Sequence, residues 1–311
     1  MTTPVRLGLV GAGRWGRVLL ENIRRHPDTS LSWVASRNAE TPALAGPGIT
    51  VVPDWRAFAD ADLDGLVVAT PAPTHAAIVL AAIEAGVPVL IEKPLCTSSA
   101  EARAILAAAE ARGAVVLVDH THVFHPGFPS LAHAVRRAGG PEWIATCGGQ
   151  HGRRGGDVGA LWDYGPHDLA LALALLGDAA ELTGAERTAA AEDGALEVLR
   201  LTLTSGGATA DLCFGNALAE KQRWIAVGTP HGVYLLDDLA AQPLTRHPAS
   251  PAPGRPQGPG EPLEVEAGMP VERLLTEFVE RIRGRRQPPG DLASAVRVVE
   301  LLEEAERLLR F

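Results

Sequence analysis

The first 120 residues alternate between two hydrophobic patterns. Short apolar runs rich in Val, Leu and Ile are separated by longer stretches rich in Ala and Leu, as expected for buried strands followed by helices. Alternating β and α segments are typical of a parallel sheet with helices on both faces. Residues 1–120 are therefore expected to form a doubly wound Rossmann domain of the α/β class. Its strands are expected at 5–10, 31–36, 49–52, 66–70, 87–92 and 114–119, and its helices at 14–26, 74–85 and 98–112.

After residue 120 the pattern changes to helices mixed with strands and turns. A helix is expected at 166–176, because Pro166 suits a first helical turn and Gly177 follows its end. Gly206-Gly207 is expected to form a hairpin turn. Residues 121–311 are therefore expected to be an antiparallel α+β domain for substrate binding and oligomerisation, whose final helix can pack back on the Rossmann domain. Its other segments are expected as helices at 129–138, 270–284 and 291–310, strands at 143–150, 195–204, 208–214, 223–227 and 233–236, and a Pro/Gly-rich loop at 240–262.

Composition narrows the class of protein. The 311 residues suffice for two domains, and 46% hydrophobic with 21% charged residues describes a globular chain. The net charge of −9 argues against a nucleic acid or an anionic membrane as the main partner. The start lacks the pattern of a signal peptide, and no stretch approaches the ~20 apolar residues of a membrane span. The three scattered cysteines fit a reducing compartment, so a cytoplasmic location is expected.

A glycine-rich loop follows the first expected strand. Gly11, Gly13 and Gly16 form a G-x-G-x-x-G motif between that strand and a helix. This spacing brings backbone N–H groups and the positive end of the helix against a pyrophosphate. The same motif can also be a tight turn without a ligand, but its place in a βαβ unit favours dinucleotide binding. Arg14 and Trp15 belong to the same loop and are expected to contact the cofactor.

The end of the second strand indicates which dinucleotide is bound. An acidic residue there would bind the ribose 2′-hydroxyl, but the chain has Ser36-Arg37 instead. A hydroxyl and a guanidinium suit a 2′-phosphate, which favours NADP over NAD. Alternatively, Arg37 stacks on the adenine or faces solvent.

A lysine follows the fifth strand, in the sequence Glu92-Lys93-Pro94. Open α/β sheets bind ligands at the carboxyl ends of their strands, where the nicotinamide is expected. A lysine amine there can polarise a substrate oxygen as charge develops on it. Lys93 could instead be an ordinary solvated lysine. Against this, the 28 basic residues include only two lysines, Lys93 and Lys221. Arg therefore serves wherever a generic positive charge is enough.

A second polar cluster begins at residue 162. If Pro166 marks the first helical turn, His167 projects from a helix N-terminus and Asp163 lies in the loop before it. A neutral imidazole there can take the proton of an alcohol, while a nearby carboxylate orients it. Asp168 is expected to complement the helix dipole in the first turn rather than to take part in catalysis.

These motifs together resemble the glucose–fructose oxidoreductase/inositol dehydrogenase (Gfo/Idh/MocA) family over nearly the whole chain. The resemblance rests on the glycine loop, Thr70-Pro71 with His75, Glu92-Lys93-Pro94, and the Asp163-x-x-x-His167 pair. It implies that the second domain carries an open, mostly antiparallel sheet used in dimers or tetramers. It also implies that Lys93, Asp163 and His167 are catalytic residues of a substrate pocket. The expected cofactor contacts are Gly11, Gly13, Arg14, Trp15, Gly16, Ser36, Arg37, Thr70, Pro71, His75 and Glu92.

The chain departs from many members in the segment after the sixth strand. Where an arginine is common, this chain has histidines, a version that looks more like the branch associated with nucleotide sugars. Arg153 suits a diphosphate or an acidic sugar, or lies in a solvated loop. The histidines could suggest a metal site, but no closed ligand set is evident, so they are expected to line the pocket without a metal. The expected substrate contacts are His120, His122, Arg153 and Tyr164.

The favoured function is an NAD(P)-dependent dehydrogenase or ketoreductase. It would transfer hydride between the nicotinamide and a secondary alcohol or ketone of a sugar, cyclitol or nucleotide sugar. An enzyme of this kind has a small-molecule substrate, and we expect a homodimer or homotetramer without nucleic-acid or membrane partners. Two alternatives are a reductase of C=N or C=C bonds on the same scaffold, and a non-catalytic NAD(P)-binding sensor.

Overall fold

The computed structural model describes every residue of the chain except 1–2, 153–157, 191–195, 285, 288–290 and 311. The chain forms two compact units. The first contains Met1–Thr121 and Pro270–Val299, and the second contains His122–Met269 and Glu300–Phe311. The sequence predicts one cut between residues 120 and 121, whereas the first unit of the structure also takes in a segment from the C-terminal part of the chain.

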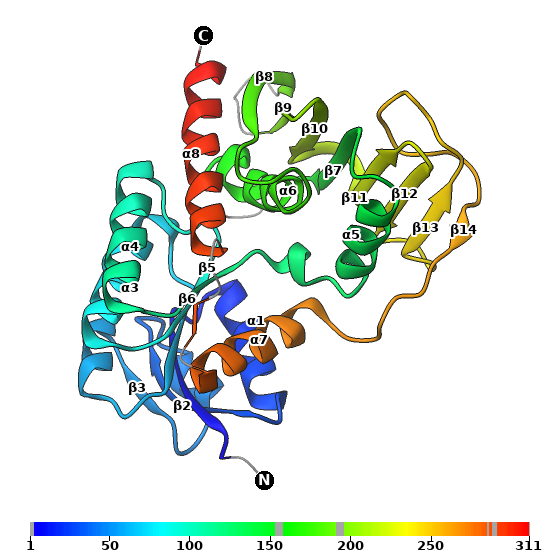
Figure 1. The fold of residues 1–311 in the computed structure, drawn as a ribbon. Helices are drawn as coiled ribbons and strands as arrows, with labels where there is room; N and C mark the ends of the chain where they lie inside the picture. The colour runs from blue at the N-terminus through cyan, green and yellow to red at the C-terminus, as the bar shows by residue number, and fades with distance from the viewer. Residues whose placement is uncertain (1–2, 153–157, 191–195, 285, 288–290, 311) are drawn as a thin grey trace. The chain divides into compact units, whose positions relative to one another are not determined.

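The first unit is built on a six-stranded parallel sheet with strands in the order β3-β2-β1-β4-β5-β6. In this unit α3 lies beside α4, and α1 lies beside α7 (Figure 1). Every residue of β4 is buried, which is why that segment is a continuous apolar run. The strand order reverses between β1 and β4, and doubly wound sheets bind ligands at the carboxyl ends of strands at such a point. The predicted Rossmann fold is confirmed. Its strands are β1 (Val5–Val10), β2 (Thr29–Ala35), β3 (Thr50–Val52), β4 (Gly65–Val68), β5 (Val89–Glu92) and β6 (Val116–Asp119).

Helices connect these strands, and a helix from the end of the chain joins them. Gly86 and Gly113 adopt left-handed φ values of 71° and 60° and end α3 and α4, where glycine avoids a steric penalty. On α7, Thr276 Oγ1 lies 3.0 Å from Nε2 of His26, which follows α1, so α7 belongs to this unit. The helical segments are α1 (Arg14–Arg25), α2 (Thr41–Ala45), η1 (Trp55–Asp60), η2 (Ala72–Thr74), α3 (His75–Ala85), α4 (Ser99–Arg112) and α7 (Pro270–Gly284). The next helix, α8 (Asp291–Leu309), begins in this unit and ends in the second.

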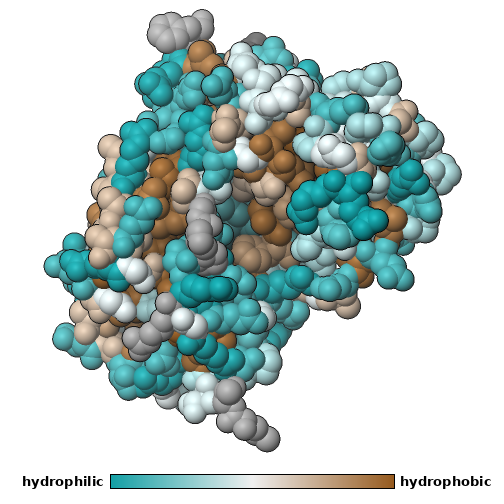
Figure 2. Space-filling view, viewed as in Figure 1, coloured by the Kyte–Doolittle hydropathy of each residue, from teal (hydrophilic) through white to brown (hydrophobic). Residues whose placement is uncertain are grey.

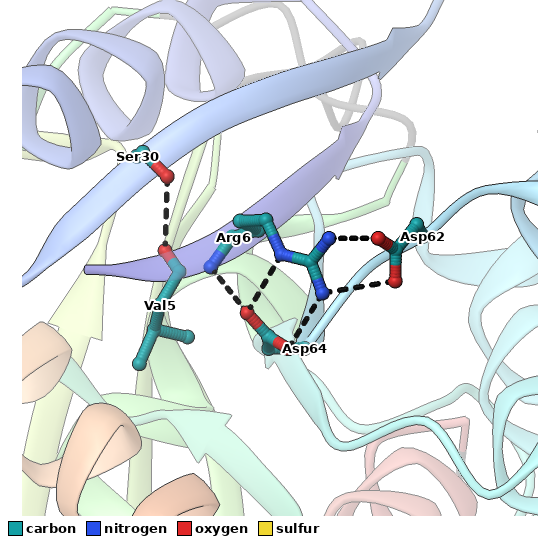
Figure 3. Close-up of polar contacts among 5 residues, drawn as sticks. All are labelled: Val5, Arg6, Ser30, Asp62 and Asp64. Carbon is teal, nitrogen blue, oxygen red and sulfur yellow. Dashed lines mark hydrogen bonds and ion pairs between the residues drawn. The ribbon is translucent and has the colours of Figure 1, made fainter. Parts of the chain in front are cut away.

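Arg6 ties β1 to the segment just before β4 (Figure 3). Its backbone N–H donates to Asp64 Oδ2 at 2.8 Å, and its guanidinium Nη2 donates to Asp64 Oδ1 at 3.1 Å. The guanidinium also pairs with Asp62. Hydrogen bonding to Arg6 lowers the pKa of both carboxyl groups below their usual range. These contacts support the pairing of β1 with β4.

The second unit is built on an eight-stranded sheet in the order β14-β13-β12-β11-β7-β10-β9-β8. Its neighbouring strands are antiparallel except β7 and β10, which run parallel, so the expected mostly antiparallel sheet is confirmed. The predicted hairpin at Gly206-Gly207 joins β9 to β10, and both glycines have positive φ. The strands are β7 (Trp143–His151), β8 (Glu181–Ala190), β9 (Glu197–Ser205), β10 (Ala208–Gly215), β11 (Ala217–Thr229), β12 (Gly232–Asp237), β13 (Leu244–His247) and β14 (Glu261–Pro262). The helical segments are η3 (Thr121–Phe124), which begins at the end of the first unit, α5 (Gly127–Arg137) and α6 (Ala160–Leu176).

Two strands of this sheet correct the sequence-based prediction of a plain loop at residues 240–262. β13 pairs with β12 in antiparallel register, with Val233 opposite His247, and β14 pairs with β13. These two strands form by backbone pairing with a neighbouring strand. The Pro/Gly-rich sequence of the segment has no hydrophobic alternation from which the strands could be predicted.

The visible surface is mostly hydrophilic, with hydrophobic residues in patches (Figure 2). In the described part of the chain, no helix combines the length and the apolar character needed to cross a bilayer. The large hydrophobic side chains that stay exposed there are Trp15, Val18, Leu239, Met269 and Leu308.

Candidate active site

The glycine loop joins the carboxyl end of β1 to the start of α1. Gly11 has a φ of 95°, and a Cβ on it would lie 2.5 Å from the Ala69 carbonyl oxygen. A Cβ on Gly16 would lie 2.0 Å from the Gly11 carbonyl oxygen. Both positions therefore require glycine for the turn itself.

Gly13 differs from its two neighbours, because a Cβ there would meet nothing within 4 Å. Gly13 is also the N-cap of α1, and no side chain caps the helix at this point. The helix therefore presents backbone N–H groups beside open space, which is what a pyrophosphate requires. The residues present fit the phosphate part of a dinucleotide.

Arg14 and Trp15 follow in the first turn of α1 and are both exposed. The indole Nε1 of Trp15 donates to Asp119 Oδ2 at 3.3 Å. Asp119 is the last residue of β6, so this hydrogen bond joins the start of α1 to the carboxyl end of β6.

Ser36 and Arg37 follow β2, as predicted. The Ser36 hydroxyl accepts hydrogen bonds from Thr41 Oγ1 at 2.9 Å and from the Asn38 N–H at 3.2 Å. It therefore helps to form the turn that starts α2. Arg37 is exposed, and the nearby acid Glu40 is paired with Arg17 at 2.7 Å. A guanidinium thus stands at the position that decides between NAD and NADP.

His75 begins α3 with a buried imidazole. Its Nδ1 lies 2.8 Å from the Pro94 carbonyl oxygen and its Nε2 lies 2.8 Å from the Thr70 carbonyl oxygen. It thereby joins the loops after β4 and β5. Thr70 and Pro71 are also fixed by Thr74, whose hydroxyl oxygen lies 2.7 Å from each of Thr70 Oγ1 and the Pro71 carbonyl oxygen.

Glu92 and Asp119 occupy matching positions at the ends of β5 and β6. Burial, the Asp119 charge and a hydrogen bond to Asp119 raise the pKa of Glu92 well above its usual range. Lys93 follows directly and is half-buried. The edge of the sheet therefore carries two carboxyl groups, one of them with a raised pKa, and an amine.

His120 follows Asp119 and is partly buried. Neither ring nitrogen has a hydrogen-bond partner among the described residues. Burial lowers the pKa of His120 to about 4, so its imidazole is neutral near pH 7. A neutral ring with both nitrogens available can accept from or donate to a polar ligand.

In the second unit, the helix expected to begin at Pro166 in fact begins at Ala160. Gly159 is its N-cap, Asp163 lies in the first turn, and Pro166 lies inside the helix. His167 therefore lies two turns into α6 rather than at its N-terminus, which corrects the prediction. Proline is unfavourable inside a helix, so the sequence favours a helix that starts at Pro166. In the structure the helix runs through this proline.

Asp168 also differs from its predicted role at a helix N-terminus. It is buried within α6, and its Oδ2 lies 3.5 Å from the Arg223 guanidinium. Burial raises the pKa of Asp168 while Arg223 opposes that shift. Arg223 lies over Gly148, where a Cβ would come within 2.4 Å of the guanidinium. Asp168 is thus half of a buried ion pair between α6 and β11.

His167 packs against a second imidazole. The rings of His122 and His167 lie 4.6 Å apart, edge to face at 80°. His122 Nδ1 lies 3.4 Å from Asp238 Oδ2, and His125 Nε2 lies 3.4 Å from Asp238 Oδ1. Asp238 and His125 also line a cavity of about 660 Å³ that opens to solvent. A carboxylate and three imidazoles therefore form one cluster.

The other predicted substrate contacts lie in different surroundings. Tyr164 is buried in α6, and Arg153 lies outside the described residues. In the described ranges, no three His, Cys, Asp or Glu side chains are grouped to hold a metal ion.

The sequence interpretation missed three polar residues of these clusters: Asp119, Arg223 and Asp238. Asp119 could have been found, because it ends a predicted strand next to the one that ends in Glu92. Asp238 and Arg223 gave no signal, because sheet pairing alone brings them to His122 and Asp168.

Comparisons with known proteins agree with this geometry. The profile of the family described as "Oxidoreductase family, NAD-binding Rossmann fold" (GFO_IDH_MocA) matches residues 5–120. The dTDP-3,4-didehydro-2,6-dideoxy-alpha-D-glucose 3-reductase of Streptomyces antibioticus is 28% identical, covering 100% of this chain and 99% of the relative. The inositol 2-dehydrogenase of Acidothermus cellulolyticus is 39% identical over 42% of this chain and 40% of its own length.

A solved structure extends the likeness to both units. A crystal structure from Magnetospirillum magnetotacticum MS-1, of a protein assigned to the oxidoreductases, is 37% identical with a TM-score of 0.90. The match covers 97% of this chain and 99% of that one.

Proposed function

Because this chain belongs to the Gfo/Idh/MocA family of oxidoreductases, we propose that it is an NAD(P)-dependent dehydrogenase or ketoreductase of sugar-like substrates. Hydride moves between the nicotinamide and a secondary alcohol or ketone of a sugar, cyclitol or nucleotide sugar. The observation that carries this proposal is the open cradle at Gly13, at the uncapped start of α1. The full-length relative, a reductase of a dTDP-linked sugar, supports a nucleotide sugar.

NADP is the cofactor that the end of β2 favours. Arg37 is exposed there, and the position holds a serine instead of an acid. A guanidinium can bind a 2′-phosphate through charge-assisted hydrogen bonds. The cofactor, when bound, supplies or accepts the hydride.

Three side chains of this chain handle the substrate oxygen and its proton. Lys93 polarises the oxygen, which stabilises the charge that develops on it during hydride transfer. His167 takes the hydroxyl proton when the alcohol is oxidised and returns it when the ketone is reduced. Asp163 orients the substrate hydroxyls or the imidazole. Burial and the neighbouring Asp119 raise the pKa of Glu92, which disfavours a negative charge on Glu92 beside Lys93.

A substrate screen with matched lysine variants tests the proposal. Free sugars, cyclitols and nucleotide sugars are mixed with NAD or NADP, and the absorbance of the reduced nicotinamide is followed. Lys93→Met is expected to lower kcat by about 10²–10³-fold, as expected for removing one donor from a developing oxyanion. Lys221→Met is the control, because Lys221 is exposed on β11 and has no proposed role.

The other functions predict different results. Unchanged turnover in Lys93→Met with an imine or enone would favour a C=N or C=C reductase. Tight binding of NADPH without turnover of any substrate would favour a sensor. We also propose that the chain assembles into a dimer or tetramer in the cytoplasm. Light scattering of the purified protein tests the oligomeric state.

A further inference from the structure

Asp238 lies far from His167 in the sequence, yet both belong to one side-chain cluster. Each oxygen of its carboxylate faces a different histidine, with Oδ2 at 3.4 Å from His122 and Oδ1 at 3.4 Å from His125. The side chains of His122 and His125 are 21% and 14% exposed. This carboxylate is therefore held from two sides in a mostly buried setting.

His122 connects Asp238 to His167. Its ring stands edge to face against the His167 ring at 4.6 Å, while its Nδ1 faces the carboxylate. A carboxylate that accepts from one ring nitrogen fixes the tautomer and the rotation of that imidazole. The orientation of the His122 ring in turn limits where the His167 ring can lie.

The backbone of Asp238 is fixed as well. Its N–H donates to the Arg223 carbonyl oxygen at 3.0 Å. The Arg223 guanidinium pairs with Asp168, the residue that follows His167 on α6. Both ends of the cluster are thus tied to β11, so Asp238 is placed by the sheet rather than by its own loop.

We propose that Asp238 is a positioning residue for His167, acting through His122. This inference rests on the proposed function, in which His167 exchanges a proton with the substrate. Burial raises the pKa of Asp238, but the His122 hydrogen bond and the charges of His122, His125 and Arg223 outweigh it. The net pKa lies below the usual value, so the carboxylate stays ionised and available to both histidines.

The first test compares two neighbouring aspartates. Asp238→Asn keeps the shape but removes the charge. Asp237→Asn is the matched control, because Asp237 pairs with Arg255 at 2.6 Å and contacts neither histidine in the described structure. We expect Asp238→Asn to lower kcat about 10–100-fold, by analogy with the loss of a partner that orients a metal-bound imidazole. The KM for the dinucleotide is expected to stay unchanged, and Asp237→Asn to keep wild-type kcat.

The second test does not depend on activity. In protein labelled with ¹⁵N-histidine, the ring signals of His167, assigned with His167→Gln, are followed from pH 5 to pH 9. Asp238→Asn is expected to shift the ring signals and the titration midpoint of His167, and Asp237→Asn to leave them in place. An inactive wild type with this shift would refute the proposed function but support the positioning role.

Several outcomes would overturn the inference. One is His167 ring signals that are the same in wild type and Asp238→Asn. Another is an equal loss of kcat in both aspartate variants, which would point to general loosening of the β12 end. Loss of activity on adding EDTA would assign the cluster to a metal instead.

Discussion

Glu92 and Asp119 end two adjacent parallel strands at matching positions, so two carboxyl groups meet at the edge of the sheet. Asp119 also accepts hydrogen bonds from Trp15 Nε1 at 3.3 Å and from Thr121 Oγ1 at 2.6 Å. Burial and the neighbouring Asp119 raise the pKa of Glu92, so this edge disfavours two negative charges side by side. Parallel pairing of β5 and β6 therefore brings two carboxyl groups from separate strand ends side by side.

The first prediction concerns the pH dependence of stability at this pair. The pKa of Glu92 is higher in the folded chain than in the unfolded one, where it is about 4.3. Its contribution to stability is therefore complete below that pH and is lost as the pH rises through the folded pKa. Glu92→Gln, which keeps a donor without an ionisable proton, should gain stability relative to wild type as the pH rises. Thermal melts from about pH 5 to about pH 8 measure the difference. The exposed Glu84→Gln is the control, and a difference in Tm that does not vary with pH would contradict the prediction.

The second prediction separates two glycines of the loop. Gly13→Ala should leave the fold intact, because its Cβ has open space, but should weaken dinucleotide binding about tenfold or more, because that Cβ would occupy the space proposed for the pyrophosphate and hold it away from the backbone N–H groups. Gly16→Ala should instead destabilise the protein by about 2–3 kcal/mol, because its Cβ overlaps the Gly11 carbonyl. Urea unfolding and NADPH titration, done on both variants, distinguish the two effects. Equal binding by Gly13→Ala and wild type would place the pyrophosphate elsewhere.

The third prediction concerns the choice of cofactor. Arg37→Ala removes the exposed guanidinium at the end of β2. The Kd for NADP should rise about 10–100-fold, because a hydrogen bond to a charged group is worth ~1.5–3 kcal/mol. The Kd for NAD should hardly change, because NAD has no 2′-phosphate. Parallel titrations with both dinucleotides test this, and an equal loss for both would indicate that Arg37 stacks on the adenine.

The fourth prediction concerns the buried ion pair in the second unit. Arg223→Gln should destabilise the protein by about 3 kcal/mol, because Asp168 would remain buried without its counter-charge. In the Asp168→Asn background the same change should cost much less, since no buried charge is left. Chemical unfolding of the two single variants and the double variant completes the cycle. Additive losses would show that the two side chains are not coupled.

The arrangement of strands and helices in the first unit followed from local patterns. Buried parallel strands such as β4 are continuous apolar runs. Helices α3 and α4 end at Gly86 and Gly113, and a glycine after a helical pattern is a recognised stop signal. Strand β8, by contrast, is exposed over most of its length and lies at the edge of the sheet, so hydrophobicity gave no sign of it. The sequence predicts that α6 begins near Pro166, because proline suits a first helical turn, whereas the helix begins at Ala160.

For the candidate site, the sequence by itself determined which side chains we propose for the chemistry: the glycines of the loop, Lys93 and His167. The glycines and Lys93 stand in short motifs whose spacing predicts their position at a strand end, and the family resemblance added His167. Only the tertiary structure decided what surrounds them. Asp238 reaches His122, and Arg223 reaches Asp168, through sheet pairings between segments separated by many residues. Such pairings depend on how side chains of distant segments pack against each other across the sheet, which the local pattern of a single segment does not reveal.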